Sequence, residues 1–255
     1  MLGLCSGIRA GTWRDPYFAV VRDGGGRVVA AALRTPPHNL ILSAVDDLDA
    51  LPPLADDLSR SVADLPGVVG PQAPARRYAE LWQERTGRAV RLEMAERIYR
   101  LSAVTPARPT AGALRRAGPG DREIVVEWLR AFALEALGQD EGKSDAAAIA
   151  DYWLGGQGRW LYLWDDGGPV SMAGASGETP NGIRVGAVYT PPELRRRGYA
   201  SACVAALSQA QLDRGRRFCF LYTDLANPTS NKIYQAVGYE PVCDVDEYRF
   251  DPPRT

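Results

Sequence analysis

The chain has 255 residues, 45% of them hydrophobic and 24% charged, a composition typical of a globular protein with one large domain or two modest ones. Its 30 basic and 31 acidic residues give a net charge of −1, so no global field favours nucleic acid or an anionic membrane as a partner. Four cysteines without a CxxC pair and a single histidine make a metal site unexpected. No apolar run reaches membrane-spanning length and the first residues lack a signal-peptide pattern, so we expect a cytoplasmic location and reduced cysteines.

The first half begins with strand patterns around a glycine-rich turn at residues 23–26, which predicts a hairpin. Helix and strand patterns then alternate. Residues 89–101 fit either an extended or a partly helical segment, and both alternatives stay open. The expected strands are residues 17–22, 28–33, 39–45 and 67–70, and the expected helices are residues 54–65 and 75–86.

The second half repeats this order after two additional helices, the first of them N-capped by Asp121 and the second at residues 146–154. Residues 241–250 close the chain as one or two strands. The expected strands before that are residues 159–164, 170–175, 183–190 and 218–223, and the expected helices are residues 199–214 and 229–237.

This shared order predicts an α+β fold made of two copies of one unit, each a mixed twisted sheet flanked by helices. Residues 104–120, rich in proline, glycine and alanine, are the best candidate for a linker between them. The second copy is complete at its front, whereas the first begins almost at its hairpin.

The most informative segment joins the expected strand 183–190 to the expected helix 199–214. Its sequence, VYTPPELRRRGYAS over residues 188–201, puts three arginines and Gly198 immediately before the helix. The first turn of a helix has unpaired N–H groups and a partial positive charge, and a glycine lets an anion approach the backbone closely. The segment therefore predicts an anion-binding loop, although it matches neither the mononucleotide P-loop nor the dinucleotide GxGxxG pattern.

The pattern Arg195-x-x-Gly198-x-Ala200 resembles the R/Q-x-x-G-x-G/A signature of the GNAT superfamily of acyltransferases. The residues before it resemble the end of that family's fourth strand. Together with a second block further along the chain, the resemblance covers residues 114–250.

The second block consists of Asn227, Ser230, Tyr234 and the pair Gly238-Tyr239, and it resembles the family's conserved segment on the helix after the fifth strand. Both blocks occur in the family's order and at about its spacing. The resemblance implies acetyl-CoA as co-substrate and an amine as acceptor, with an oligomer possible.

The resemblance also implies roles for individual residues. Backbone groups of Val188 and Thr190 would bind the pantetheine arm as an added strand, and Asn227 would contact the same arm. Tyr234 would be the general acid for the leaving thiolate, because a phenol stays protonated at neutral pH. The expected cofactor-binding residues are Val188, Tyr189, Thr190, Arg195, Arg196, Arg197, Gly198, Tyr199, Ala200, Ser201, Asn227, Ser230 and Tyr234.

The general base is less clear, because the fourth-strand position that often carries a carboxylate in this family corresponds to Arg184. Glu178, on the preceding hairpin, joins Tyr234 as a catalytic candidate. Glu135, Asp140 and Glu141, after the first helix of the second half, are the alternatives.

Where the first copy would have its anion-binding loop, residues 46–53 read DDLDALPP, which is acidic and has no glycine. Such a loop repels a pyrophosphate. We therefore expect residues 1–105 to be a degenerate GNAT-like domain without a cofactor loop and residues 106–255 to be the acetyl-CoA-binding domain.

The sequence as a whole favours an N-acetyltransferase that moves an acetyl group from acetyl-CoA directly to a primary amine in a ternary complex. Two alternatives remain. The unlocated base suggests a regulatory module that binds acyl-CoA without turnover, and the degenerate first half suggests a structural or interaction protein with both sites inactive.

Overall fold

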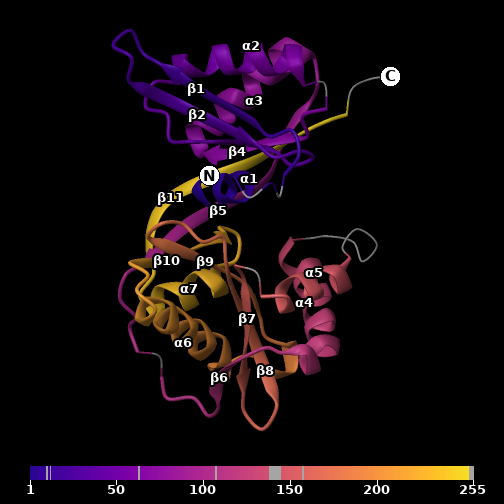
Figure 1. Ribbon diagram of the computed structural model, residues 1–255, viewed down its shortest axis with the longest axis vertical. Coiled ribbons are helices and arrows are strands. Elements are labelled where there is room, and N and C mark those ends of the chain that lie inside the picture. The colour runs from indigo at the N-terminus through magenta and orange to yellow at the C-terminus, as the bar shows by residue number, and fades with distance from the viewer. Residues whose placement is uncertain are drawn as a thin grey trace. The chain divides into compact units, whose positions relative to one another are not determined.

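The computed structural model describes residues 1–9, 11, 13–62, 64–106, 108–137, 145–156 and 158–252 (Figure 1). The chain divides into two compact units. The first contains Met1–Ile98, Thr223–Ala226 and Val242–Thr255, and the second contains Tyr99–Tyr222 and Asn227–Pro241. The division expected from the sequence, 1–105 and 106–255, differs from these units mainly in the C-terminal strand, which belongs to the first unit.

The first unit is a sheet that carries α2 and α3 on one face. Strands β1, β2 and β3 pair antiparallel in sequence, and β3 pairs parallel with β4 through the crossover helix α2. Strand β11 then pairs antiparallel with β4. The elements are α1 (Leu2–Arg9), β1 (Tyr17–Arg22), β2 (Val28–Arg34), β3 (Leu40–Leu42), α2 (Leu51–Ser61), β4 (Gly67–Pro71), α3 (Gln72–Thr86), β5 (Val90–Leu101) and β11 (Glu240–Phe250).

The second unit repeats this topology. Strands β7, β8 and β9 pair antiparallel, and β9 pairs parallel with β10 through the crossover helix α6. Strand β6 adds to the edge of β7. The elements are β6 (Ala113–Arg116), α4 (Arg122–Leu137), α5 (Ala146–Leu154), β7 (Trp160–Asp165), β8 (Pro169–Ser176), β9 (Gly182–Tyr189), α6 (Tyr199–Asp213), β10 (Phe218–Asp224) and α7 (Pro228–Val237).

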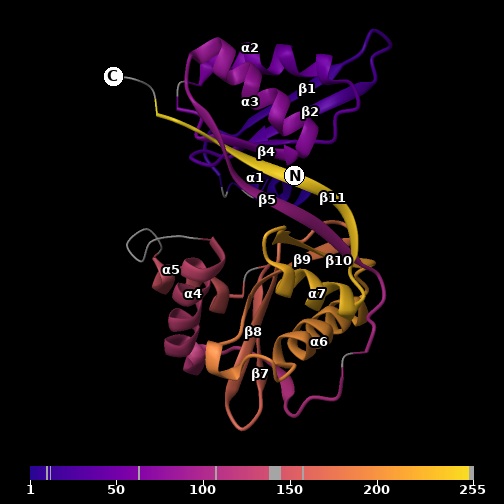
Figure 2. The ribbon, with the colours of Figure 1, turned by 180° about the vertical axis from the view of Figure 1, so that it is seen from behind.

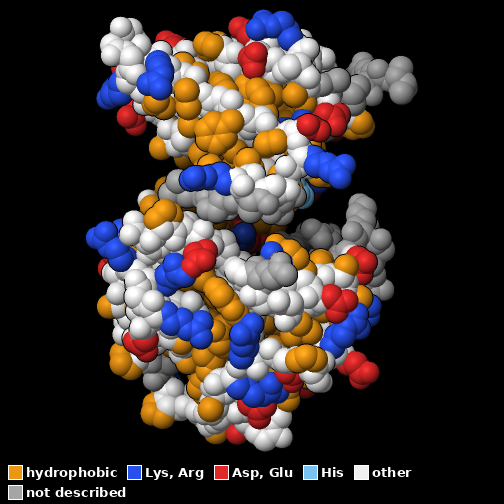
Figure 3. Space-filling model, in the orientation of Figure 1, with side chains coloured by type: hydrophobic (Ala, Val, Ile, Leu, Met, Phe, Trp, Pro, Cys, Tyr) orange, Lys and Arg blue, Asp and Glu red, His pale blue; other side chains and the backbone are white. Residues whose placement is uncertain are grey.

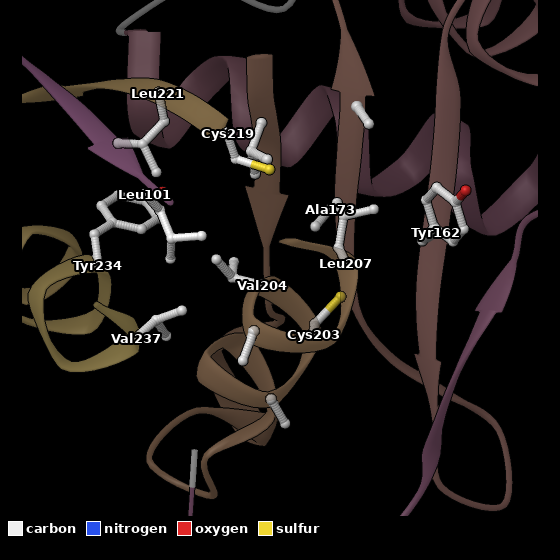
Figure 4. Packing of buried hydrophobic residues seen from close by; sticks show 14 of the residues in the cluster. Leu101, Tyr162, Ala173, Cys203, Val204, Leu207, Cys219, Leu221, Tyr234 and Val237 are labelled. Atoms are coloured by element: carbon white, nitrogen blue, oxygen red, sulfur yellow. The ribbon is translucent and has the colours of Figure 1, made fainter. Parts of the chain in front are cut away.

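Helices cover both faces of the second unit's sheet, and the two views in Figures 1 and 2 agree on the arrangement: α6 and α7 lie on one face, α4 and α5 on the other. Each face has its own core. Cys203, Val204 and Leu207 of α6 pack with alternate residues of the strands in one core (Figure 4). Val125, Trp128 and Leu129 of α4 form the other core.

The fold class expected from the sequence is confirmed: each unit is a mixed sheet flanked by helices. Most expected elements lie within two or three residues of their observed bounds, and the undecided segment 89–101 is the strand β5. The expected linker 104–120 is wrong in part, because its residues Ala113–Arg116 form β6. Helix α1 was not expected.

The surface carries charges of both signs. In the space-filling view, basic and acidic side chains are interspersed on the face shown (Figure 3). This distribution agrees with the net charge of −1 and with the absence of a single-sign field in the sequence.

Gly67 tests the pairing of β4 with β11. A Cβ atom at Gly67 would collide with the backbone oxygen of Tyr248 and lie 2.9 Å from Oδ1 of Asn39. Because the paired backbone cannot retreat, Gly67→Ala should lower the free energy of unfolding by about 1–3 kcal/mol, measured by urea denaturation. Gly24→Ala is the control, since a Cβ there meets no atom within 4 Å. Equal stability of both variants would contradict the pairing.

Candidate functional site

Strand β9 carries a bulge close to its C-terminal end. Its register against β8 shifts between the pairs Met172–Tyr189 and Gly174–Gly186, so that β9 has one extra residue. Ala187 lies in this interval and has φ of 49°, a left-handed conformation that is rare for a residue with a side chain. The bulge also reverses the side-chain alternation: Val185 and Val188 pack on the α6 face, whereas Ala187 packs on the α4 face.

The bulge coincides with the loss of pairing on the other side of β9. The parallel pairing with β10 joins Phe218–Phe220 to Gly182–Arg184 and extends no further among the described residues. Beyond Arg184, the edge of β9 toward β10 therefore has backbone donors and acceptors without a strand partner. Such groups favour a ligand that can pair as a strand does.

The chain passes from β9 into an open loop before α6. Ser171 Oγ lies 2.8 Å from Thr190 Oγ1 and 3.0 Å from the backbone oxygen of Tyr189, which anchors the end of the strand. Arg196 and Gly198 then take left-handed conformations, with φ of 66° and 86°. Gly198 is the N-cap of α6 and provides no side-chain cap.

The result is a run of free backbone amides. Arg195 N–H donates to the Pro192 oxygen and Ala202 N–H to the Gly198 oxygen, but the six amides between them donate to no described backbone or side-chain group. Successive amides in alternating conformations, followed by the start of a helix, form an anion-binding concavity. The residues are Arg196, Arg197, Gly198, Tyr199, Ala200 and Ser201.

The arginines of the loop differ in their partners. Arg195 Nε donates to the Thr190 oxygen at 2.9 Å, and its Nη2 contacts Glu135 Oε2 at 2.6 Å. Arg196 and Arg197 are exposed. Tyr199 is buried and its hydroxyl donates to Asp166 Oδ2 at 2.7 Å, a hydrogen bond that raises the pKa of Tyr199. Arg195 and Tyr199 therefore hold the loop in place. Arg197 Nη2 donates to the Glu193 backbone oxygen at 3.5 Å, so Arg196 is the loop arginine for which the described residues provide no such contact.

The second expected block lies at the start of α7. The Asn227 side chain caps the helix by accepting from Ser230 N–H at 3.0 Å, and Asn231 Nδ2 donates to the Asn227 oxygen at 2.8 Å. Tyr99, which is fully buried, donates from its hydroxyl to Asn231 Oδ1 at 3.0 Å. Tyr99 belongs to no motif, yet it fixes the orientation of this helix start.

Tyr234 projects from α7 into the α6-side core, close to Leu101 and Leu221 (Figure 4). Its ring meets that of Tyr239 edge-on at 6.0 Å. Burial raises the pKa of Tyr234 to about 12. The hydroxyl donates to no described residue, whereas Tyr239 shares a 2.8 Å hydrogen bond with Ser208. Tyr234 therefore has a protonated donor that is still available to a ligand.

The candidates for a general base are engaged elsewhere. Glu178 forms an ion pair with Arg216, and Glu135 pairs with Arg195 and accepts from the Tyr189 hydroxyl at 3.4 Å. Arg184 is exposed and its guanidinium lies 4.9 Å from the centre of the Tyr222 ring. The alternatives Asp140 and Glu141 lie outside the described residues.

The corresponding point in the first unit has a different structure. After β3 the chain forms a short 3₁₀ turn, Leu48–Ala50, which Asp47 caps by accepting from Asp49 N–H. Helix α2 follows at once and has Pro52 and Pro53 in its first turn. Prolines have no N–H group, so this helix start presents fewer donors to an anion than the start of α6.

Comparison with known families gives one match: residues 123–239 match the model of the Acetyltransferase (GNAT) family. This match identifies that segment as a GNAT acetyltransferase domain, which confirms the resemblance inferred from the two sequence blocks. Both blocks, and all of the site described above between β9 and α7, lie within the matched residues. No curated protein matches the sequence.

Solved structures show the same fold over nearly the whole chain. A GCN5-related N-acetyltransferase from Kribbella flavida is 17% identical, with 99% of this chain and 96% of that chain covered and a TM-score of 0.62. A Drosophila protein is 15% identical, with 99% and 87% covered and a TM-score of 0.65. A GCN5-related N-acetyltransferase from Sphaerobacter thermophilus is 16% identical, with 92% and 80% covered and a TM-score of 0.58. At these identities the likeness concerns the fold.

The described residues contain no group of three or more histidine, cysteine, aspartate or glutamate side chains placed to hold a metal ion. They also contain no helix that is both long and apolar enough to span a bilayer.

The ionisation of Tyr234 tests its environment. The Tyr234 ring-carbon NMR signal can be assigned as the tyrosine signal that is missing from the spectrum of Tyr234→Phe. In the wild type, its chemical shift should stay that of the protonated phenol until about pH 12, because burial disfavours the phenolate. Since the folded pKa exceeds the ordinary value of 10, the associated stability is complete below pH 10 and falls as the pH rises toward 12. A midpoint near pH 10 would place the ring in water.

Proposed function

We propose that the chain is an acetyl-CoA-dependent N-acetyltransferase that moves the acetyl group directly to a primary amine in a ternary complex. The observation that carries this proposal is the pair of unpaired backbone sets on one connection, the edge of β9 beyond Arg184 and the six amides that lead into the first turn of α6. The family match over residues 123–239 supports acyl transfer in general.

The loop before α6 would bind the pyrophosphate of acetyl-CoA. Six consecutive amides supply donors, and the start of α6 adds its partial positive charge. Arg196 and Arg197 add positive charge at the rim. Gly198 supports the left-handed conformation of the loop, and a Cβ atom there would lie 3.0 Å from Thr110 Oγ1.

The free edge of β9 would bind the pantetheine arm. The two amide groups of the pantetheine arm provide alternating hydrogen-bond donors and acceptors, much as a strand does. The backbone groups of Val188 and Thr190 can therefore pair with the arm. Asn227, which is exposed at the start of α7, would contact the same arm from the other side. Tyr189 and Ser230 would act indirectly, through the packing of the strand end and the helix cap.

The bulge at Ala187 would position the thioester. It turns β9 amides away from the regular ladder, where they can donate to the carbonyl oxygen as negative charge develops on it. The neutral acceptor amine forms a bond to the carbonyl carbon, the bond from carbon to sulfur breaks, and the nitrogen loses its surplus proton to water as the amide forms. Tyr234 would donate its proton to the leaving sulfur, which keeps the coenzyme thiol from re-attacking as a thiolate.

The acceptor reaches the site as an ammonium and must lose a proton to react. Glu178 remains the proposed base, acting directly or through water, although its carboxylate is engaged in the ion pair with Arg216. That pairing, and the pairing of Glu135 with Arg195, favour the second candidate function, a regulatory module that binds acyl-CoA without turnover.

Residues 106–255 would hold this single cofactor site, and residues 1–105 would not bind acetyl-CoA. The prolines at the start of α2 and the acidic turn before it support this assignment. We therefore expect one acetyl-CoA per chain.

Gly198→Glu tests the location of the pyrophosphate. The new carboxylate would lie where the phosphates bind, so acetyl-CoA affinity should fall about a hundredfold or more in a calorimetric titration. Gly215→Glu is the matched control: it has φ of 88° against 86° at Gly198 and lies at the opposite end of α6. It imposes the same backbone strain and the same charge. Equal losses in both variants, or two sites per wild-type chain, would contradict the assignment.

Tyr234→Phe tests the general acid. Loss of the proton donor should lower kcat by about a hundred- to ten-thousandfold and leave acetyl-CoA affinity within a few fold. Tyr239→Phe removes a hydroxyl from the same core and should change kcat little, because that hydroxyl is bonded to Ser208. An unchanged rate in Tyr234→Phe removes this residue from the acid role. If the wild type binds acetyl-CoA but releases no thiol with any amine tested, the regulatory module is favoured.

A further inference from the structure

The face of β9 and β10 that lies away from α6 carries chemistry that the proposed mechanism does not use. Cys219 and Leu221 of β10, and Ile183 and Val185 of β9, point into the α6-side core. Because side chains alternate along a strand, their neighbours lie on the opposite face. We call this surface the acceptor face; it consists of Phe218, Phe220 and Tyr222 on β10 and Gly182, Arg184 and Gly186 on β9.

Three aromatic rings form a ladder along β10 on the acceptor face. The ring centres of Phe218 and Phe220 are 6.3 Å apart, and those of Phe220 and Tyr222 are 6.4 Å apart. All three side chains are half-buried. Gly182 makes room for the ladder, because a Cβ atom there would strike the Phe218 ring. The ladder provides an apolar surface that is still open to a ligand.

Gly186 leaves a hollow beside the bulge. A Cβ atom built there would meet only Arg184 Nε, at 3.9 Å. Gly174 lies opposite Gly186 in the register of β8 and β9, and the Trp153 indole of α5 covers it at contact distance. The open position at Gly186 therefore lies between the β8 residue that the indole covers and the edge of β9 that faces β10.

Arg184 is the charged group beside the bulge on the acceptor face, while the guanidinium of Arg100 lies over Phe218 at the other end of the ladder, 5.5 Å from the ring centre. The Arg184 side chain is exposed and stacks on Tyr222, and none of the described carboxylates pairs with it. Glu178 lies near Arg184, because the preceding residue, Gly177, is close to the Arg184 side chain. The carboxylate of Glu178 nevertheless pairs with Arg216. A stacked guanidinium without a counter-ion is held ready to bind a planar anion such as a carboxylate.

From these observations we infer that the acceptor is a small amino carboxylic acid with an apolar side chain, whose carboxylate binds Arg184. The inference rests on the proposed function and specifies its substrate. Arg184 precedes the bulge residue Ala187 by three strand positions, about 10 Å at about 3.3 Å per residue. Because the Arg184 side chain extends from the strand, the distance left between its guanidinium and the thioester would match the length of an amino acid. A polyamine, with positive charge throughout, would be repelled by Arg184.

Pairs of acceptors that differ only in the carboxylate test the inference. Leucine, methionine, phenylalanine and tryptophan are compared with their carboxamides and with a diamine, by thiol release from acetyl-CoA. The wild type should prefer each acid over its amide by about ten- to a hundredfold in kcat/KM. This comparison is stringent, because the amine of a carboxamide loses its proton more readily and is intrinsically the better nucleophile at neutral pH.

Variants separate the role of Arg184 from general damage. Arg184→Gln should abolish the preference for the acid while leaving acetyl-CoA affinity unchanged by calorimetry, and Arg184→Lys should restore part of it. Arg214→Gln, an exposed arginine at the end of α6, should behave as the wild type.

Three results would overturn the inference: an unchanged acid preference in Arg184→Gln, amides or the diamine used as well as the acids, or no acetylation of any acid by a wild type that binds acetyl-CoA. Absence of acetyl-CoA binding to the wild type is a different result. It would remove the proposed function itself, and the inference with it.

Discussion

The constraint on which the site depends is that buried backbone polar groups must find partners. Strand β9 is paired with β8 along most of its length but with β10 only at its first three residues. Unpaired groups occur again in the free amides before α6, after a turn at residues 189–195 whose backbone groups are largely paired. Under the proposed function, a ligand that carries both amides and phosphates would match these two sets of groups, and the backbone rather than any side chain would define what binds.

The side chains around this backbone act mainly to hold it. Ser171 fixes the end of β9, Asp166 fixes Tyr199 in the first turn of α6, and Tyr99 fixes the start of α7 through Asn231. Each of these contacts joins elements that are distant in sequence. A concavity made of amides binds an anion well only when its shape exists before the ligand arrives, since ordering it on binding would cost affinity.

Much of the fold could be predicted from the sequence, because hydrophobic periodicity and turn residues mark elements such as β1 and α6 directly. Strand β6 was missed because its four residues lie among prolines and glycines and are strand only through pairing with β7. In the site, Gly198 carries a sequence signal, since a left-handed N-cap favours glycine. The bulge at Ala187 carries none, because alanine is an unusual residue for φ of 49° and the neighbouring strands impose it. The ion pair of Glu178 with Arg216 was equally hidden, since it depends on tertiary contact alone.

The two units show how one topology can keep its fold while its chemistry differs. Both place a crossover helix after the third strand of an antiparallel set, and both bury that helix in a core of aliphatic and aromatic residues. The core does not include the amides at the helix start, so changes there cost little stability. Two prolines and an acidic turn at the start of α2 remove donors and add negative charge without disturbing Leu54 and Leu58 in the core below. Loss of anion binding is therefore compatible with an intact unit, and under the proposed function this would allow a first half without a cofactor site to persist beside a second half that holds one.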